Sequence, residues 1–201
     1  MSRPLPRDFY QRDTITVARE LLGKLLVHGS REGRCAGLIV ETETYLYPDD
    51  PDNHAYRGRT QRNASMYLPG GVAYVYFLYG FHWLLNAVTR EGGVPEAVLI
   101  RALEPREGLD LMRRRRGKCD DRVLTSGPAR LTQALGIDGT LDCADLCQGR
   151  LMILDGDVKL GAIGASSRVG CRRTRERLLR FFVVDNPHVS RGPSRRGDAV
   201  D

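Results

Sequence analysis

The sequence predicts an α+β fold in a single domain with an antiparallel sheet. Strand-like runs follow one another across turns too short for helical crossovers, which favours antiparallel pairing. Helical periodicity is confined to a segment near the start and another in the middle, so helices and strands do not alternate. The chain has 201 residues, 41% of them hydrophobic, and neither a linker nor an internal repeat divides it. One hydrophobic core is therefore expected.

The first half of the chain opens with a helix and continues as strands. Residues 1–12 are expected to form a loosely attached arm, followed by an amphipathic helix over 14–24, with Thr14 or Thr16 as N-cap and Gly23 at its end. A polar glycine-bearing loop over 29–34 is expected to join the first two strands into a hairpin. The strand-like runs are 24–28, 35–44, 72–78, 82–89 and 97–103.

The second half begins with helical periodicity and returns to short strands. Helices are expected over Glu107–Arg116 and Ala129–Leu135, and short strands within Leu151–Ala165 and Leu179–Val184. The tail over 191–201 has few apolar residues, and we expect it to be flexible.

The charge balance indicates a polyanionic partner. Lys and Arg number 31 against 25 Asp and Glu, a formal charge of +6, and arginine dominates the basic residues. Arginine favours bidentate phosphate contacts. No apolar run reaches the roughly 18–20 residues of a membrane helix, and the N-terminus has no signal core. A cytoplasmic protein without membrane contact is therefore expected.

The cysteines do not predict a disulfide framework. They number five, and none forms a Cys-x-x-Cys motif. Cys143 and Cys147 could bind a metal together with Cys119, but buried cysteines acting as small hydrophobic residues are favoured. The four histidines are scattered, and no motif indicates a cofactor. We therefore expect neither metal nor cofactor.

The stretch Gly37–His54 carries the most chemistry. An apolar run leads to Glu41 and Glu43, which at i and i+2 of a strand point to the same face. Tyr45 follows, and the proline-containing segment after it forces a loop that ends near His54. His54 could act as a general acid, stack on a ligand, or fix the loop. Acid, aromatic ring and imidazole thus gather at the edge of a sheet.

Arg101 interrupts an apolar strand and must be paired if it is buried. An unpaired guanidinium in a core strand would be too costly to keep. Glu41 and Glu43 are the only acids in a comparable strand, so we expect Arg101 to pair with one of them, Glu43 above all. The pair could belong to an active site or be a structural ion pair.

Aromatic residues surround a predicted hairpin tip at Tyr79–Phe81. Rings exposed at a tip could intercalate into stacked bases, whereas others would belong to the core, Phe77 among them.

Ser126-Gly127-Pro128 with Arg130 resembles an anion site at a helix start. The basic positions that could form a phosphate-binding rim are Arg57, Arg59, Arg62, Arg113–Arg116, Lys118, Arg130, Arg172, Arg173, Arg175 and Arg177.

Several motifs together resemble the alkyladenine (3-methyladenine) DNA glycosylases. They run in order from about Ala18 to about Ser190: VETETY, the loop to His54, RTQRNASM, AYVYFLYG, Asn86, LIRALEP and SGPARLTQALGI. The resemblance implies a single α+β domain with a curved antiparallel sheet and a protruding hairpin. It also implies a monomeric, monofunctional enzyme that needs no metal and excises alkylated or deaminated purines from double-stranded DNA.

The same resemblance implies roles for individual residues. Glu43 would activate the attacking water, with Arg101 and the main-chain carbonyl of Val169 completing the shell of that water. The everted base would lie between Tyr45 and His54 on one side and Tyr76 on the other, with Asn86 crowding the purine 2-position. The turn at Gly170 would read the base edge, and Tyr79 would fill the vacated stack. The implied DNA contacts are Tyr79, Arg59, Arg62, Asn63 and Arg130.

Some residues depart from the family pattern, at positions that would affect which lesion is preferred and how the protein binds DNA. They lie at Tyr47, Phe81, Trp83, Cys171 and Arg172–Arg173.

Two other functions are also compatible with the sequence. One is a non-catalytic protein that binds damaged DNA, in which Arg101 and Glu43 are only structural. The other is a carbohydrate hydrolase that uses Glu41 and Glu43 as an acid and base pair.

Overall fold

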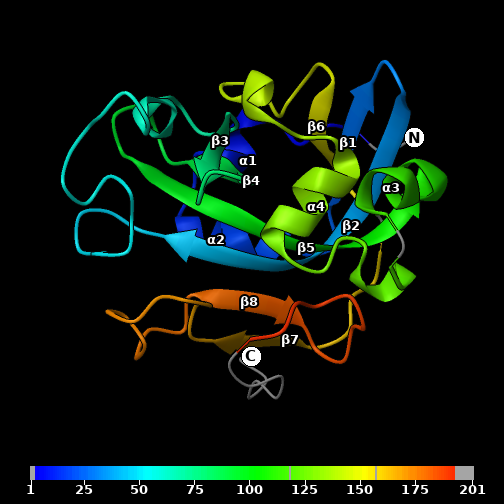
Figure 1. Cartoon of the computed structure of the whole chain (residues 1–201). Helices are drawn as coiled ribbons and strands as arrows, with labels where there is room; N and C mark the ends of the chain where they lie inside the picture. Colours follow the sequence, from blue (N-terminus) through cyan, green and yellow to red (C-terminus); the bar gives the residue numbers. More distant parts are fainter. Residues whose placement is uncertain (1–2, 118, 157, 193–201) are drawn as a thin grey trace.

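The computed structural model contains a curled antiparallel sheet, and the stretch Gly37–His54 begins on one of its central strands (Figure 1). The structure describes residues 3–117, 119–156 and 158–192. The strands are β1 Leu25–Ser30, β2 Gly33–Tyr45, β3 Ala73–Leu78, β4 His82–Thr89, β5 Glu96–Glu107, β6 Leu151–Leu154, β7 Ile163–Ser166 and β8 Arg180–Val183. Their order is β3-β4-β5-β2-β1-β6, and β8 pairs with both β2 and β7. The α+β prediction is confirmed.

Strand β2 lies at the centre of this sheet. Its first half pairs with β1 on one edge, and Glu41–Glu43 pair with β8 on that edge. The other edge pairs with β5 throughout. The second half of β2 is consequently covered on both edges, and residues 35–44 are all buried.

The helices cover one face of the sheet. They are α1 Arg7–Tyr10, α2 Thr14–Glu20, α3 Leu109–Arg116 and α4 Pro128–Leu135, with short 3-10 turns at Ala64–Tyr67, Asp121–Val123 and Gly139–Leu141. Apolar side chains of α2, α3 and α4 share the largest core cluster with those of β1 to β6. None of the helices in the described ranges is both long and apolar enough to cross a membrane.

Several predicted boundaries were wrong. Residues 4–12 are not a loose arm, because Leu5 and Tyr10 are buried in the core. Asp13, not a threonine, caps α2 by accepting a hydrogen bond from the amide of Thr16. Helix α3 starts only at Leu109, since β5 runs on through Glu107. The loop predicted over 29–34 is a two-residue turn between longer strands. Most of the predicted tail, 193–201, lies outside the described residues.

Candidate active site

Glu43 is a fully buried carboxylate held by three donors. The amide of Val169 donates to Oε1 at 2.6 Å, while Arg101 Nη1 and the Tyr45 hydroxyl donate to Oε2, each at 3.2 Å. The side chain of Glu43 has no exposed surface. A carboxylate accepts about four hydrogen bonds. One acceptor position on Oε1 is consequently left for another donor, such as a water molecule.

The environment of Glu43 makes it more basic than an ordinary glutamate. Burial raises its pKa, and the negative charge of Glu41 adds to this effect. Arg101 and the Val169 amide act in the opposite direction, but burial prevails and the pKa of Glu43 lies above the usual value. Raised carboxyl pKa values are typical of groups that accept a proton near neutral pH.

A bulge between Glu41 and Thr42 in the pairing of β2 with β5 places Arg101 between the two glutamates. Glu41 lies opposite Ala102 and Thr42 opposite Ile100, so Arg101 is an extra residue on its strand. Bulges redirect side chains in this way. Arg101 donates through Nε to Glu41 at 2.8 Å and through Nη1 to Glu43 at 3.2 Å. The predicted pairing is confirmed, although the shorter bond goes to Glu41.

Glu41 is a charge partner rather than a second reacting group. Its carboxylate accepts hydrogen bonds from Arg101 and Arg180 and from both the amide and the hydroxyl of Ser190. Burial would raise the pKa of Glu41, but the two arginines hold it below its usual value. An ionised, enclosed carboxylate cannot donate a proton to a leaving group, which argues against the carbohydrate hydrolase hypothesis.

A small aromatic cavity of about 110 Å³ lies beside Glu43. This volume exceeds the ~10–15 Å³ that a single water needs, so a flat ring entering it would displace several waters. Tyr45, which bonds to Glu43, is part of its wall. The cavity is lined by Tyr45, Asp52, His54, Met66, Tyr74, Tyr76, Asn86, Ala97 and Cys171. We call it the base pocket.

The rings of the base pocket are arranged differently from the sequence prediction. His54 contacts Tyr76 edge to face, with ring centroids 4.6 Å apart, and Tyr76 stacks on Tyr74 at 5.2 Å. A base therefore does not fit between His54 and Tyr76 in this structure, and these two rings form one wall. Tyr45 stands apart from them. Asn86 lines the same pocket and bonds the carbonyl of Tyr74 at 3.2 Å.

His54 and Tyr76 are uncharged near neutral pH. Packing of His54 against its neighbours lowers its pKa, and Arg62 lowers it further. Burial raises the pKa of Tyr76 to about 12. The His54 Nδ1 atom lies 2.7 Å from the Tyr74 hydroxyl, which fixes the ring. The wall that His54 and Tyr76 form is thus a neutral aromatic surface, and Asp52 lines the same pocket.

Sequence reasoning missed the ion pair that fixes Tyr45. Arg168 and Asp50 are both fully buried and share two hydrogen bonds of 2.7 and 2.6 Å. The Arg168 guanidinium also lies over the Tyr45 ring, 4.4 Å from its centroid. Asp50 stands in a run of turn-forming residues, where an acid usually indicates only a loop. No signal in the sequence distinguished it.

The hairpin tip between β3 and β4 carries two exposed aromatic rings. Tyr79 is 80% exposed and Phe81 68%, on either side of Gly80. The register pairs Leu78 with His82, so three residues form the tip, and Tyr79 and Gly80 among them have positive φ. The prediction that Phe77 belongs to the core was wrong, because it is exposed and packs on Trp83.

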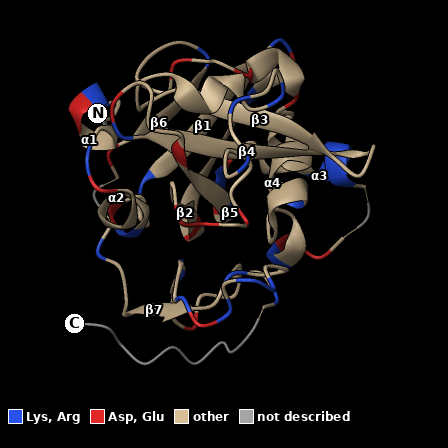
Figure 2. Ribbon diagram, turned by 90° about the vertical axis from the view of Figure 1, so that its left-hand side faces the viewer, with Lys and Arg blue, Asp and Glu red and all other residues tan. Residues whose placement is uncertain are grey.

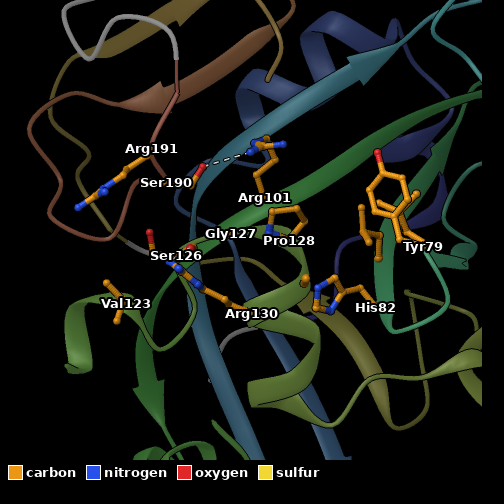
Figure 3. A pocket seen from close by; sticks show the side chains of 13 residues that line it. Tyr79, His82, Arg101, Val123, Ser126, Gly127, Pro128, Arg130, Ser190 and Arg191 are labelled. Carbon is orange, nitrogen blue, oxygen red and sulfur yellow. Dashed lines mark hydrogen bonds between the residues drawn. The ribbon is translucent and has the colours of Figure 1, made fainter. Parts of the chain in front are cut away.

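A larger cavity of about 520 Å³ lies between the hairpin tip and the start of α4. Figure 3 shows Arg101 and Ser190 on one side of it and Tyr79 and His82 on the other. Arg130 lines this cavity and bonds the carbonyl of Ser126 at 3.1 Å. Arg101 thus lines the cavity at the predicted anion site and also bonds Glu41 and Glu43.

The other predicted DNA contacts divide into exposed and buried residues. Arg59 and Arg62 are exposed and lie over the rings of Tyr67 and Tyr76. Asn63 is buried, and its side chain bonds the carbonyls of His54 and Gly58 and the amide of Thr60. Its predicted DNA contact was therefore wrong for the side chain, which orders the loop instead.

Three of the four arginines over Arg113–Arg116 of α3 form hydrogen bonds within the protein. Arg113 bonds Asp110 and Asp121, Arg115 bonds Glu32, and Arg116 bonds Gln133. Lys118 lies outside the described residues. Figure 2 shows further Lys and Arg stretches in the loops beside β7.

The cysteines are mostly not core residues. Only Cys35 is buried, Cys143 is exposed, and the other three are intermediate. Burial as a small hydrophobic residue was therefore wrong for Cys143, whereas Cys119 and Cys147 are partly buried and pack against the largest core cluster. In the part of the chain that the structure describes, no group of three or more His, Cys, Asp or Glu could hold a metal ion.

Comparison with known sequences gives one consistent result. The model of the family "Methylpurine-DNA glycosylase (MPG)" matches residues 8–187. A protein of Methanoculleus marisnigri is 48% identical over 93% of this chain and 98% of its own length. Proteins of Chlorobaculum tepidum and Carboxydothermus hydrogenoformans are 45% and 46% identical over 93% of this chain and over 90% and 98% of their own lengths. All three carry the name "Putative 3-methyladenine DNA glycosylase".

Proposed function

The chain belongs to the methylpurine-DNA glycosylase family, and on this premise we propose that it excises alkylated or deaminated purines from double-stranded DNA with a water activated by Glu43. The substrates would include 3-methyladenine, hypoxanthine and ethenoadenine. The enzyme would act as a monomer and leave an abasic site. The observation that carries the proposal is a buried glutamate of raised pKa, bonded to Tyr45 at the wall of an aromatic pocket.

The damaged nucleotide must leave the helix to reach this pocket. Eversion of a nucleotide costs a few kcal/mol, and less for a damaged or mispaired base. Stacking on Tyr45 and against the wall of His54 and Tyr76 would offset this cost by roughly 1–3 kcal/mol per ring. Tyr79, at the exposed hairpin tip, would fill the space left in the base stack. Asn86 would crowd a substituent at the purine 2-position.

Cleavage of the glycosidic bond develops positive charge on the sugar. The Glu43 carboxylate would stabilise this charge and accept a proton from the attacking water at its remaining Oε1 position. The bonds from Arg101 and the Val169 amide fix the carboxylate in place. The role expected for the Val169 carbonyl stays a prediction.

The aromatic walls of the pocket would favour positively charged bases. A 3-methyladenine lesion carries positive charge, which a tyrosine face attracts and which makes the base a good leaving group. Hypoxanthine is neutral and leaves only when it is protonated. His54, with its lowered pKa, holds no spare proton near pH 7. We therefore expect faster release of 3-methyladenine than of hypoxanthine.

Incubation with methylated duplex DNA tests the proposal. The protein should release free 3-methyladenine, detected by liquid chromatography and mass spectrometry, and leave strands that break only on alkali treatment. The absence of any released base would contradict the proposed activity. Strand breaks without alkali would contradict the monofunctional mechanism.

A further inference from the structure

A third cavity, lined by arginine, lies against the base pocket. It measures about 530 Å³ and is lined by Ser167, Arg168, Gly170, Cys171, Arg172 and Arg175. All six residues belong to the loop 167–179 between β7 and β8, drawn in orange at the left of Figure 1. Cys171 lines both this cavity and the base pocket. The two cavities are thus direct neighbours.

The loop that forms this cavity is anchored to residues 49–52. Thr174 is buried, accepts a bond from Arg168 at 2.8 Å and donates to Asp52 at 2.9 Å. Arg177 bonds the carbonyl of Asp49 at 3.0 Å. Inward-facing side chains therefore hold the loop in place beside the active site.

The remaining arginines of this loop have no use within the described structure. Arg172, Arg173 and Arg175 are exposed, and within residues 3–117, 119–156 and 158–192 none of them forms a hydrogen bond or an ion pair. This contrasts with Arg113, Arg115 and Arg116 of α3. Neighbouring unpaired guanidinium groups at a cavity repel each other unless an anion lies between them. Guanidinium groups bind phosphate oxygens particularly well.

The main chain leaves open space at Gly170, which lines this cavity. Gly170 has φ +81°, and a Cβ built on it would contact nothing within 4 Å. When a base occupies the base pocket, its sugar lies at the mouth, and the phosphates on either side of that sugar lie at the rim. A cavity that shares Cys171 with the base pocket is therefore within reach of such a phosphate.

We propose that Arg172 and Arg175 bind a backbone phosphate next to the everted nucleotide, in the cavity beside the base pocket. This inference rests on the proposed function, because it requires a nucleotide in the base pocket. Free phosphate has the same chemistry, and the experiments below distinguish the two sources.

The first experiment measures the salt dependence of DNA binding. The probe is a fluorescent duplex with one abasic-site analogue, and the variants are Arg172→Gln/Arg175→Gln and the control Arg31→Gln/Arg114→Gln. The control removes the same charge from exposed arginines of the β1–β2 turn and α3, at the opposite end of the molecule (Figure 1). The slope of log affinity against log salt should fall by about 0.9 for each phosphate that the variant no longer binds. It should stay unchanged in the control.

The second experiment locates the phosphate. Duplexes carry a single uncharged methylphosphonate at each linkage flanking the analogue in turn. The native protein should lose affinity at one linkage, and Arg172→Gln/Arg175→Gln should be insensitive to that same replacement. Identical patterns for both proteins would overturn the inference. So would inorganic phosphate that binds the native protein while no methylphosphonate position matters, since the cavity would then take free phosphate.

Base release distinguishes the two proposals. Circular dichroism shows whether Arg172→Gln/Arg175→Gln is folded, and the control Arg31→Gln/Arg114→Gln should release 3-methyladenine as fast as the native protein. Base release by the native protein together with an unchanged salt slope in folded Arg172→Gln/Arg175→Gln would contradict only the phosphate site. Failure of the native protein to release any base would contradict the proposed function itself.

Discussion

The amide of Val169 donates a 2.6 Å hydrogen bond to the carboxylate of Glu43, across 126 positions of sequence. The bond ties the loop between β7 and β8 to the central strand of the sheet. It also leaves one acceptor position on that carboxylate oxygen, which is where the proposed water would bind. The position of one main-chain amide thus sets the geometry of the proposed general base.

Gly170→Ala tests the importance of this amide. Gly170 has φ +81°, and the left-handed conformation costs an alanine roughly 1–2 kcal/mol. Because there is space for the Cβ, the strain should displace the Val169 amide rather than create a clash. We expect a lower single-turnover rate of base release with nearly unchanged DNA affinity. Gly161→Ala, at a position with similar space and no positive φ, is the control and should behave as the native protein. Equal rates for all three proteins would show that the amide is not needed.

The rate of base release should depend on pH through Glu43. Its pKa is raised by burial above the usual 4.5, and only the deprotonated carboxylate can accept a proton from water. The single-turnover rate should therefore be constant above this raised pKa and fall about tenfold per pH unit below it. In Glu43→Gln this acidic limb should be absent. A native profile without a limb above pH 4.5 would contradict the role of the raised pKa.

Asp50→Asn tests the buried ion pair with Arg168. Removal of one partner leaves a buried charge uncompensated, so the free energy of unfolding should fall by about 3–5 kcal/mol in urea denaturation. Asp110→Asn breaks an exposed pair with Arg113, in which the Asp110 side chain is 87% exposed, and should cost at most about 1 kcal/mol. Similar losses in both variants would show that the Asp50 pair has no special stabilising role.

Much of the fold follows from the sequence because the determining interactions are local. The β-branched runs, the hairpin tip at Tyr79 and Gly80 and the helix that begins with Pro128 were each predicted within a few residues. The pairing of Arg101 with Glu41 and Glu43 was also predictable, since burial of a charge demands a partner.

The rest of the site depends on contacts that are distant in sequence. Arg168, Arg180 and Ser190 come from the last strands and loops, and they meet Asp50 and Glu41 only when β8 pairs with β2. The edge-to-face contact between His54 and Tyr76 depends on the conformation of the loop that carries His54, which residue types alone do not determine. The DNA contact of Asn63 was implied by the family resemblance, and its internal hydrogen-bond partners could not be foreseen from the sequence.

Tyr79→Ala tests the role of the hairpin tip. The tyrosine makes no contribution to the core, since it is 80% exposed, so the variant should remain stable. It should bind a lesion-containing duplex more weakly, by roughly 1–3 kcal/mol if one stacked ring is removed, while its affinity for single strands changes much less. Fluorescence anisotropy with both probes measures the difference. Equal losses of affinity for duplex and single strand would contradict the proposal that Tyr79 fills the space left in the base stack.

The central claim is that Glu43 activates the water that attacks the sugar. Its most direct test is single-turnover release of 3-methyladenine from duplex DNA by the native protein and by Glu43→Gln, with circular dichroism and DNA affinity as controls. We predict that the variant stays folded, binds lesion DNA, and releases the base at least about 10²-fold more slowly. A folded Glu43→Gln protein that releases the base at the native rate would contradict the claim.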